Sequence, residues 1–248
     1  MEWGVINKGG HVNIFNSDQL LGWEKNGKGE LLADLATPRS DYAALYTLMR
    51  ERGWVGQFNH PSQSGQFLVN GTAFSTNDRE GETRRSNYEA ACNMLLEAGF
   101  HVAFSTNQDN HCANWGTAYT NRTGVLIPAG AALSRDSFVE ALKARRVFAT
   151  MDKGSQLVLT ANGRMMGERF TNSGALNLVT HFASTAGKQV ATVAIMEGVP
   201  GRNGTVTQLV DAATANFTPS VGAHFYYAKV TQADGNILWS APVWVMQK

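Results

Sequence analysis

Asp109 and His111 are the residues whose types and spacing most directly indicate chemistry. They lie two positions apart, just after the apolar run 101–104, which we predict to be a strand. Alternate residues of an extended segment share a face, so this carboxylate and imidazole would point to the same place. Such a pair suits a divalent cation such as zinc, manganese or iron. The same spacing also occurs by chance in loops, which leaves an ordinary loop as the alternative.

Two more histidines lie upstream, in places that we predict to be close to strand ends. His60 precedes Pro61, and a residue before proline is held extended, which would fix the direction of its imidazole. The alternative is a loop histidine bonded to a backbone carbonyl. His11 follows Gly9 and Gly10, whose backbone would allow close approach to a ligand. The alternative there is the start of an ordinary hairpin.

Several other polar residues are candidates for substrate binding or for structural roles. Arg122 follows the Asp109 loop and would hold a substrate oxyanion. Asn114 would line the same pocket, or else pack that loop. Arg145 and Arg146 end a predicted helix, where a cation favours the helix dipole, so we predict a structural role for them. We predict structural roles also for three histidines: His101, His181 and His224.

The segments that must position these residues change in character near residue 150. Before it, apolar strand patterns alternate with helical ones, and this alternation predicts an α/β domain over residues 1–152. Ligands of a parallel sheet or barrel bind at the carboxyl ends of the strands, where His60, Asp109 and His111 would lie. We predict strands at 11–15, 54–58, 101–104, 123–127 and 146–149, and helices at 40–52, 86–98 and 134–144. Ser40 or Asp41 would cap the first helix, which Gly53 would end.

Helical periodicity disappears after residue 150. Short strand patterns follow, with a hairpin turn at 233–236, and they predict a small antiparallel β-sandwich domain over residues 153–248. The predicted strands are 156–160, 175–180, 191–195, 225–230 and 242–245.

Composition narrows the class of protein. The 248 residues are 43% hydrophobic and 17% charged, with a net charge of +1, which predicts a globular chain without a nucleic-acid or membrane partner. We expect no signal peptide at the start of this chain, and the sequence leaves its compartment undetermined. Cys92 and Cys112 are too few for a disulfide framework. Serine-nucleophile and dinucleotide-binding motifs are not found in the sequence.

The ordered motifs Gly10-His11-Val12-Asn13, Asn59-His60-Pro61 and Asp109-Asn110-His111 resemble the polymerase and histidinol phosphatase (PHP) superfamily of metallohydrolases. Segments 107–116, 121–124, 144–150 and 240–245 are similar to its CehA/McbA-like branch. The resemblance implies a β/α barrel that binds divalent metal ions. It makes Glu2 a bridging carboxylate that shares one metal site with His11 and His60, while Asp109 and His111 would bind further ions.

The family begins with an H-x-H strand that has no counterpart here, so we expect a partial PHP-type barrel. The resemblance implies a metal-dependent hydrolase that cleaves a phosphoester or a carbamate or similar ester of a small molecule through metal-activated water. His111 would donate a proton and Arg122 would neutralise charge. One alternative is a non-catalytic remnant whose β-sandwich binds a partner. Another is a separate chain that supplies the missing strands.

Overall fold

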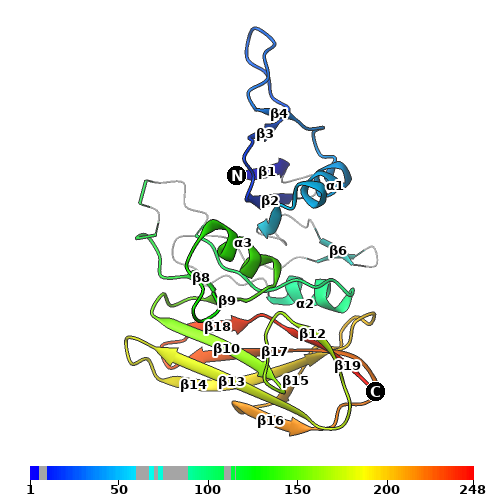
Figure 1. Cartoon of the computed structure of the whole chain (residues 1–248), viewed down its shortest axis with the longest axis vertical. Helices are drawn as coiled ribbons and strands as arrows, with labels where there is room; N and C mark the ends of the chain where they lie inside the picture. The colour runs from blue at the N-terminus through cyan, green and yellow to red at the C-terminus, as the bar shows by residue number, and fades with distance from the viewer. Residues whose placement is uncertain (6–9, 60–66, 70–71, 75–88, 109–112, 115) are drawn as a thin grey trace. The chain divides into compact units, whose positions relative to one another are not determined.

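The computed structural model describes residues 1–5, 10–59, 67–69, 72–74, 89–108, 113–114 and 116–248. These residues divide into two compact units, Met1–Ala91 and Cys92–Lys248 (Figure 1). The division therefore differs from the boundary after residue 152 that we predicted from the sequence.

The first unit contains a three-stranded antiparallel sheet in the order β1-β2-β5, formed by β1 (Glu2–Val5), β2 (Gly10–Phe15) and β5 (Val55–Asn59). Helix α1 (Tyr42–Arg52) begins after Asp41, whose side chain accepts a hydrogen bond from the backbone N–H of Ala44. The smaller strands are β3 (Leu21–Gly22), β4 (Leu35–Ala36), β6 (Phe67–Val69) and β7 (Thr72–Phe74).

The alternation of side chains along this sheet separates an apolar face from a polar one. Trp3, Val12 and Ile14 are buried in a core that also contains Leu45 and Met49 of α1. Successive residues of a strand point to opposite faces. The apolar positions of β2 therefore pack toward the helix, and its alternate positions, with histidine and asparagine side chains, lie on the other face.

The predicted α/β fold class, with a partial PHP-type barrel, is wrong for the described residues. β1, β2 and β5 pair antiparallel, and the parallel pairs that the structure describes are β3 with β4 and β12 (Arg169–Asn172) with β19 (Val243–Gln247). Residues 6–9 connect β1 to β2, and a parallel crossover needs about a dozen residues or more. The alternative that we gave for His11, a hairpin start, is the arrangement found.

The second unit consists mainly of two β-sheets that pack face to face (Figure 1). Fully buried side chains of both sheets form one core, including Leu157 and Leu178 from the smaller sheet and Tyr226 and Val243 from the larger. The smaller sheet has the order β11-β10-β13-β16, from β11 (Arg164–Met165), β10 (Ser155–Ala161), β13 (Leu176–Ser184) and β16 (Thr214–Phe217). The larger has the order β12-β19-β17-β18-β9-β8, with β14 paired to β17 and to β15. Its other strands are β17 (Gly222–Gln232), β18 (Ile237–Ser240), β9 (Val147–Thr150), β8 (Arg122–Val125), β14 (Val190–Gly198) and β15 (Thr207–Val210).

The strands predicted after residue 150 are confirmed as β10, β13, β14, β17 and β19, but their sheet extends further back along the chain. β9 pairs antiparallel with both β18 and β8, so residues 122–150 belong to the β-rich unit and not to a parallel sheet. All four side chains of β9 are buried. The predicted strand at 101–104 is wrong, because that segment has no regular secondary structure.

The remaining elements are two helices. α2 (Glu89–Glu97) lies within the predicted helix 86–98, and α3 (Arg135–Lys143) begins after Ser134, which forms a capping box with Ser137. In the described part of the chain, none of the helices has the length and apolar character needed to cross a bilayer.

Candidate functional site

Two of the predicted metal ligands, Glu2 and His11, lie next to each other on the polar face of the first unit's sheet. Glu2 Oε1 is 3.3 Å from His11 Nδ1, and the two side chains are 34% and 26% exposed. Asn59 Nδ2 donates a hydrogen bond of 2.7 Å to the same carboxylate oxygen, and Asn59 Oδ1 accepts one of 3.1 Å from Asn13 Nδ2. The result is a partly exposed carboxylate–imidazole pair that an almost fully buried amide holds from one side.

Strand register explains why these side chains meet. His11 is paired with Gly4 on β1 and with Asn59 on β5, and Glu2 is paired with Asn13. Residues paired across strands, and their neighbours two positions along, share one face. Glu2 is thus part of a paired strand, although a residue so close to a chain end is often frayed.

Tyr42 of α1 holds together the end of β1 at Val5 and the start of β2 at Gly10. Its hydroxyl donates a 2.6 Å hydrogen bond to the Gly10 carbonyl and accepts one of 3.1 Å from the Val5 N–H. Gly10 has a φ of 88°, in the region that favours glycine. The backbone immediately before His11 is therefore held by a helix side chain, which limits the directions that the imidazole can take.

The Glu2–His11 spacing meets a simple test for a metal site. Zinc bonds to histidine nitrogen and carboxylate oxygen are about 2.0–2.2 Å long, which puts neighbouring ligand atoms roughly 2.9–3.4 Å apart for octahedral to tetrahedral angles. The observed separation of 3.3 Å lies in that range. A carboxylate oxygen and an imidazole nitrogen are also ligand types that zinc, manganese and iron share. These two residues therefore fit a divalent cation, as they also fit a simple ion pair.

The other predicted ligands, His60, Asp109 and His111, lie outside the described residues, so their placement stays a prediction. Among the residues that are described, no group of three or more His, Cys, Asp or Glu side chains is arranged to hold a metal ion. The structure thus brings together two of the five predicted metal ligands.

Arg122, the predicted oxyanion clamp, forms hydrogen bonds with backbone carbonyls of its own loop. Its Nη1 donates to the carbonyls of Tyr119 at 2.8 Å and Asn121 at 2.7 Å, and its Nη2 donates to the carbonyl of Gly116. These contacts hold segment 116–121 against the start of β8. The guanidinium therefore has a loop-organising role here, and substrate binding by Arg122 stays a prediction.

Asn114 contributes its backbone to the same loop. Its carbonyl accepts hydrogen bonds from the Thr117 N–H at 3.1 Å, the Thr117 hydroxyl at 2.8 Å and the Ala118 N–H at 3.2 Å. These contacts shape a turn, which agrees with the loop-packing alternative for Asn114. These backbone hydrogen bonds do not test the predicted role of the Asn114 side chain in substrate binding, which stays a prediction.

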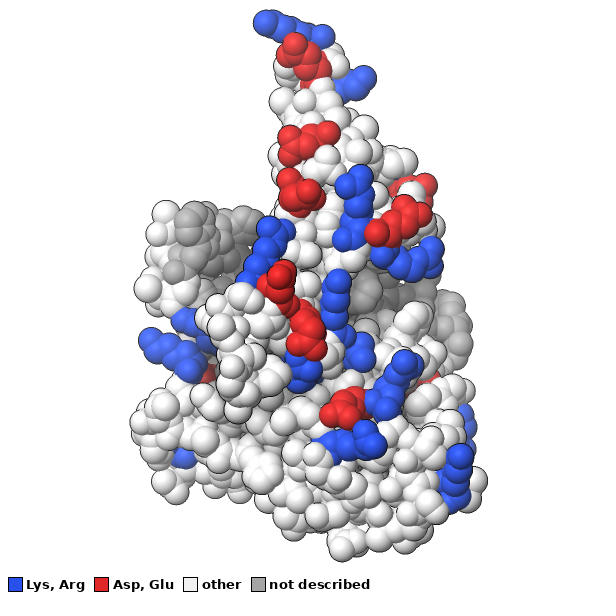
Figure 2. Space-filling view, viewed as in Figure 1, with Lys and Arg blue, Asp and Glu red and all other residues white. Residues whose placement is uncertain are grey.

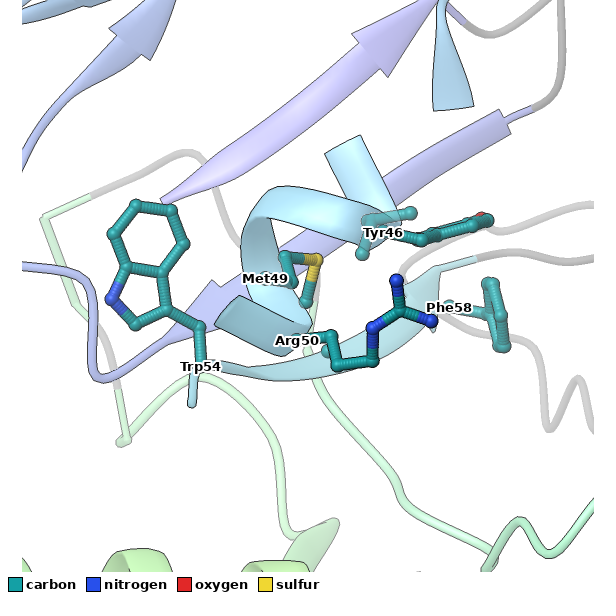
Figure 3. Close-up of a pocket in the computed structure, with 7 residues that line it drawn as sticks. Tyr46, Met49, Arg50, Trp54 and Phe58 are labelled. Atoms are coloured by element: carbon teal, nitrogen blue, oxygen red, sulfur yellow. The ribbon is translucent and has the colours of Figure 1, made fainter. Parts of the chain in front are cut away.

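A groove of the first unit lies on the other face of the same sheet. It has a volume of about 310 Å³ and is lined by residues of α1, β2 and β5 and the turn between α1 and β5 (Figure 3). The Tyr46 and Phe58 rings contact each other with centroids 6.4 Å apart. Burial raises the pKa of the Tyr46 hydroxyl, and nearby Tyr42 raises it further. Val12 faces this groove whereas His11 faces away from it, so the groove and the Glu2–His11 pair are separate features.

Asn59 is the residue of this site that sequence reasoning did not select. It belongs to the Asn59-His60-Pro61 motif, but we considered only the histidine as a ligand. The available signal was its position at the end of a predicted strand, directly before a candidate ligand. Its role depends on the pairing of β5 with β2, which the local sequence does not specify.

Comparisons with known proteins do not assign a family. No protein-family model matches the chain, and no curated protein matches it. Among solved structures, fibronectin(III)-like modules of Clostridium thermocellum CbhA align at 24% identity and a TM-score of 0.28, over 36% of this chain and 94% of that one. An engineered protein aligns at 18% identity and a TM-score of 0.27, over 38% of this chain and 20% of that one. A modular endo-β-1,4-mannanase from Cellulomonas fimi aligns at 16% identity and a TM-score of 0.23, over 49% and 28%. At these TM-scores the alignments support no inference about fold or function.

Proposed function

We propose that this protein is a metal-dependent hydrolase that cleaves a phosphoester, or a carbamate or similar ester, of a small molecule. The observation that carries the proposal is the 3.3 Å contact between Glu2 Oε1 and His11 Nδ1 on a polar sheet face. The resemblance of the His11, His60 and Asp109–His111 motifs to PHP metallohydrolases supports the same class of reaction.

The chain's own residues would have distinct roles. Glu2 and His11 would bind the ion, and Asn59 would orient the Glu2 carboxylate through its 2.7 Å hydrogen bond. A bound divalent cation supplies Lewis-acid chemistry, because it makes water more acidic and polarises the oxygen of the scissile bond. His60, Asp109 and His111 are the sequence-predicted residues that would complete the set.

Metal titration of the full chain tests the proposal. We expect purified protein to bind Mn²⁺ or Zn²⁺ saturably in calorimetry. Glu2→Gln and His11→Gln should each weaken that binding by more than about tenfold. Asn59→Ala should weaken it by about tenfold, the lower end of the roughly 10–100-fold loss that follows removal of a residue that orients a ligand. Matched controls are Glu24→Gln and His181→Ala, which change an exposed carboxylate and an exposed histidine elsewhere. Both controls should bind the ion like the parent chain.

Activity is measured separately with phosphomonoester, phosphodiester, carboxylic ester and carbamate substrates, with added metal and then with a chelator. Turnover that requires the metal and falls in Glu2→Gln and His11→Gln would support the hydrolase. Metal binding that none of these variants changes would mean that Glu2 and His11 form only a structural pair. A bound ion without turnover of any substrate would favour the alternative of a non-catalytic binding protein.

A further inference from the structure

Two basic side chains contact the indole ring of Trp244 in the second unit, and a third, Arg169, lies beside one of them. The guanidinium carbon of Arg145 lies 5.5 Å from the ring centroid, and the His101 ring meets the indole edge to face at 4.9 Å. Arg169 Nη1 is 3.5 Å from His101 Nδ1. The indole is 5% exposed, whereas His101 and Arg169 are exposed, so basic groups border solvent above a buried aromatic ring.

Arg145 occupies a backbone position where glycine is usual. It follows α3 with a φ of 55°, and its N–H bonds the Leu142 carbonyl at 2.9 Å while the Arg146 N–H bonds the Ala141 carbonyl at 3.0 Å. This is the Schellman arrangement, whose left-handed residue is most often glycine. A residue with a side chain costs roughly 1 kcal/mol more in that conformation. The contacts of the arginine side chain therefore offset this backbone cost.

Gly167 fixes the direction of that side chain. The Gly167 carbonyl accepts hydrogen bonds of 3.3 Å from both Nε and Nη2 of Arg145. A Cβ at Gly167 would come within 2.2 Å of the Ala144 carbonyl oxygen, so the two backbones lie in direct contact. Arg169, two residues further on, is paired in register with Trp244 at the start of the edge strand β12. The geometry thus presents two guanidinium groups on a rigid base.

Positive charge in this cluster is not compensated by a described carboxylate. The adjacent arginines have ion pairs, Arg146 with Glu140 and Arg164 with Glu168, but neither Arg145 nor Arg169 has one among the described residues. Basic and acidic side chains are interspersed on the face shown in Figure 2, so this imbalance is a local property.

The pKa values of His101 and Arg145 are lowered in part by the uncompensated positive charge of this cluster. Partial loss of hydration against the Trp244 ring lowers the pKa of the His101 imidazole, although the residue is exposed, and the positive charges of Arg169 and Arg145 lower it further. Burial likewise lowers the pKa of Arg145, with a further contribution from Arg169. The buried indole N–H of Trp244 has no hydrogen-bond acceptor in the described part of the chain. A buried donor without an acceptor costs about 1–3 kcal/mol, so this N–H is an unsatisfied polar group of the core beneath the basic side chains.

We propose that Arg145, Arg169 and His101 form a binding site for a phosphate group. Guanidinium groups bind tetrahedral oxyanions through paired, charge-assisted hydrogen bonds, and two of them beside an imidazole match a dianion. Arg145 retains the Nη1 donors that its bonds to Gly167 do not use. This site is independent of the metal-binding residues of the first unit.

Titration of the full chain with inorganic phosphate at low ionic strength tests the site. We expect saturable binding in calorimetry and a shift of the His101 ring signals in NMR spectra. Arg169→Gln should weaken phosphate binding at least about tenfold, because it removes one of two guanidinium groups. Arg164→Gln, which removes an exposed arginine that is already paired with Glu168, should bind phosphate like the parent chain. Phenyl phosphate in place of phosphate distinguishes a site for phosphate monoesters from one for the free ion.

Two results would overturn the site: no saturable phosphate binding to the parent chain, or equal binding by Arg169→Gln and the parent. Acetate binding as tight as phosphate binding would also contradict a preference for tetrahedral anions. Arg169 is exposed on an edge strand, so its replacement should leave the fold intact, and a thermal melt checks this. Arg145→Gln, which also loses the Gly167 bonds, is the second variant and should weaken binding likewise.

Discussion

Two charged clusters of the second unit are built in opposite ways. The Glu97 side chain at the end of α2 is 4% exposed and accepts hydrogen bonds from one loop: the N–H groups of Gly204 at 2.9 Å and Val206 at 2.8 Å, and both the N–H and the hydroxyl of Thr205. Near Trp244, His101 and Arg169 are exposed and Arg145 is half-buried, and neither arginine has an ion pair within the described residues. One cluster satisfies its charge internally, and the other does not.

This difference in hydrogen bonding distinguishes charged residues with a structural role from those that can bind a ligand. A buried carboxylate that accepts four hydrogen bonds has little capacity left for a ligand, so Glu97 serves to hold the loop. Arginines with unused donors retain the capacity to bind an anion. The Glu2–His11 pair of the first unit is a third case, because the carboxylate faces an imidazole, a side-chain type that can itself bind a metal ion.

Replacement of Glu97 should have the largest effect on stability. Glu97→Ala leaves several backbone N–H groups of the loop at 204–206 without their acceptor, and each such group costs about 1–3 kcal/mol where it stays buried. We expect a loss of about 2–4 kcal/mol in the free energy of unfolding, measured by urea denaturation. The control Glu51→Ala changes an exposed residue of α1 and should shift stability by less than about 0.5 kcal/mol. Similar losses for the two variants would contradict a loop-holding role for Glu97.

Asp152 offers a smaller, pH-dependent test of a satisfied carboxylate. Burial raises the pKa of its carboxyl, but hydrogen bonds from Ser155 at 2.6 Å, the Gly154 N–H at 3.1 Å and Gln232 at 3.3 Å outweigh burial, and the net shift is downward. A lowered folded-state pKa contributes stability that is present above the unfolded value of about 4 and is lost as the pH falls through the folded value.

Asp152→Asn should therefore reduce the free energy of unfolding by about 1–2 kcal/mol at pH 7, because the amide cannot accept the same charge-assisted hydrogen bonds. The difference between the variant and the parent chain should shrink as the pH falls from 5 to 2. Denaturation curves at several pH values measure it. Parallel acid-side profiles of the two proteins would show that Asp152 does not contribute in this way.

Arg145→Gly should have the smallest effect on stability and the most selective effect on binding. Glycine removes the conformational cost of the left-handed backbone at this position, which is roughly 1 kcal/mol. The substitution also removes the contacts of the arginine with Trp244 and the Gly167 carbonyl. The two effects nearly cancel, so we expect a change of less than about 1 kcal/mol in phosphate-free buffer. Added phosphate should raise the melting temperature of the parent chain and have a clearly smaller effect on the variant. An equal rise in both would argue against Arg145 as part of the site.

Local signals predicted most of the individual elements. Asp41, one of the two residues predicted to cap α1, is its N-cap. Gly53 ends the helix as predicted, with a φ of 65°. Ser134 caps α3 as predicted, with a capping box. These predictions succeeded because caps and turns depend on residues within a few positions of each other.

The prediction of strand pairing failed where the paired strands are far apart in the sequence. β8 and β9 were predicted for a parallel sheet, but they pair antiparallel within the sheet that contains β18. The run at 101–104 has strand-like residues, yet Phe104 packs against the Tyr227 and Trp239 rings without pairing in a sheet. Hydrophobic periodicity reports which side chains become buried, and it does not identify the strand that lies alongside.

The sequence by itself determined the caps of α1 and α3, part of the strand positions and the residue types that a metal site would use, because these follow from local backbone preferences and side-chain chemistry. Only the tertiary structure decided that Glu2, His11 and Asn59 share a sheet face, and that Arg145 and His101 meet at Trp244. Both arrangements depend on strand register and on contacts between residues far apart in the chain, which packing of the whole unit selects.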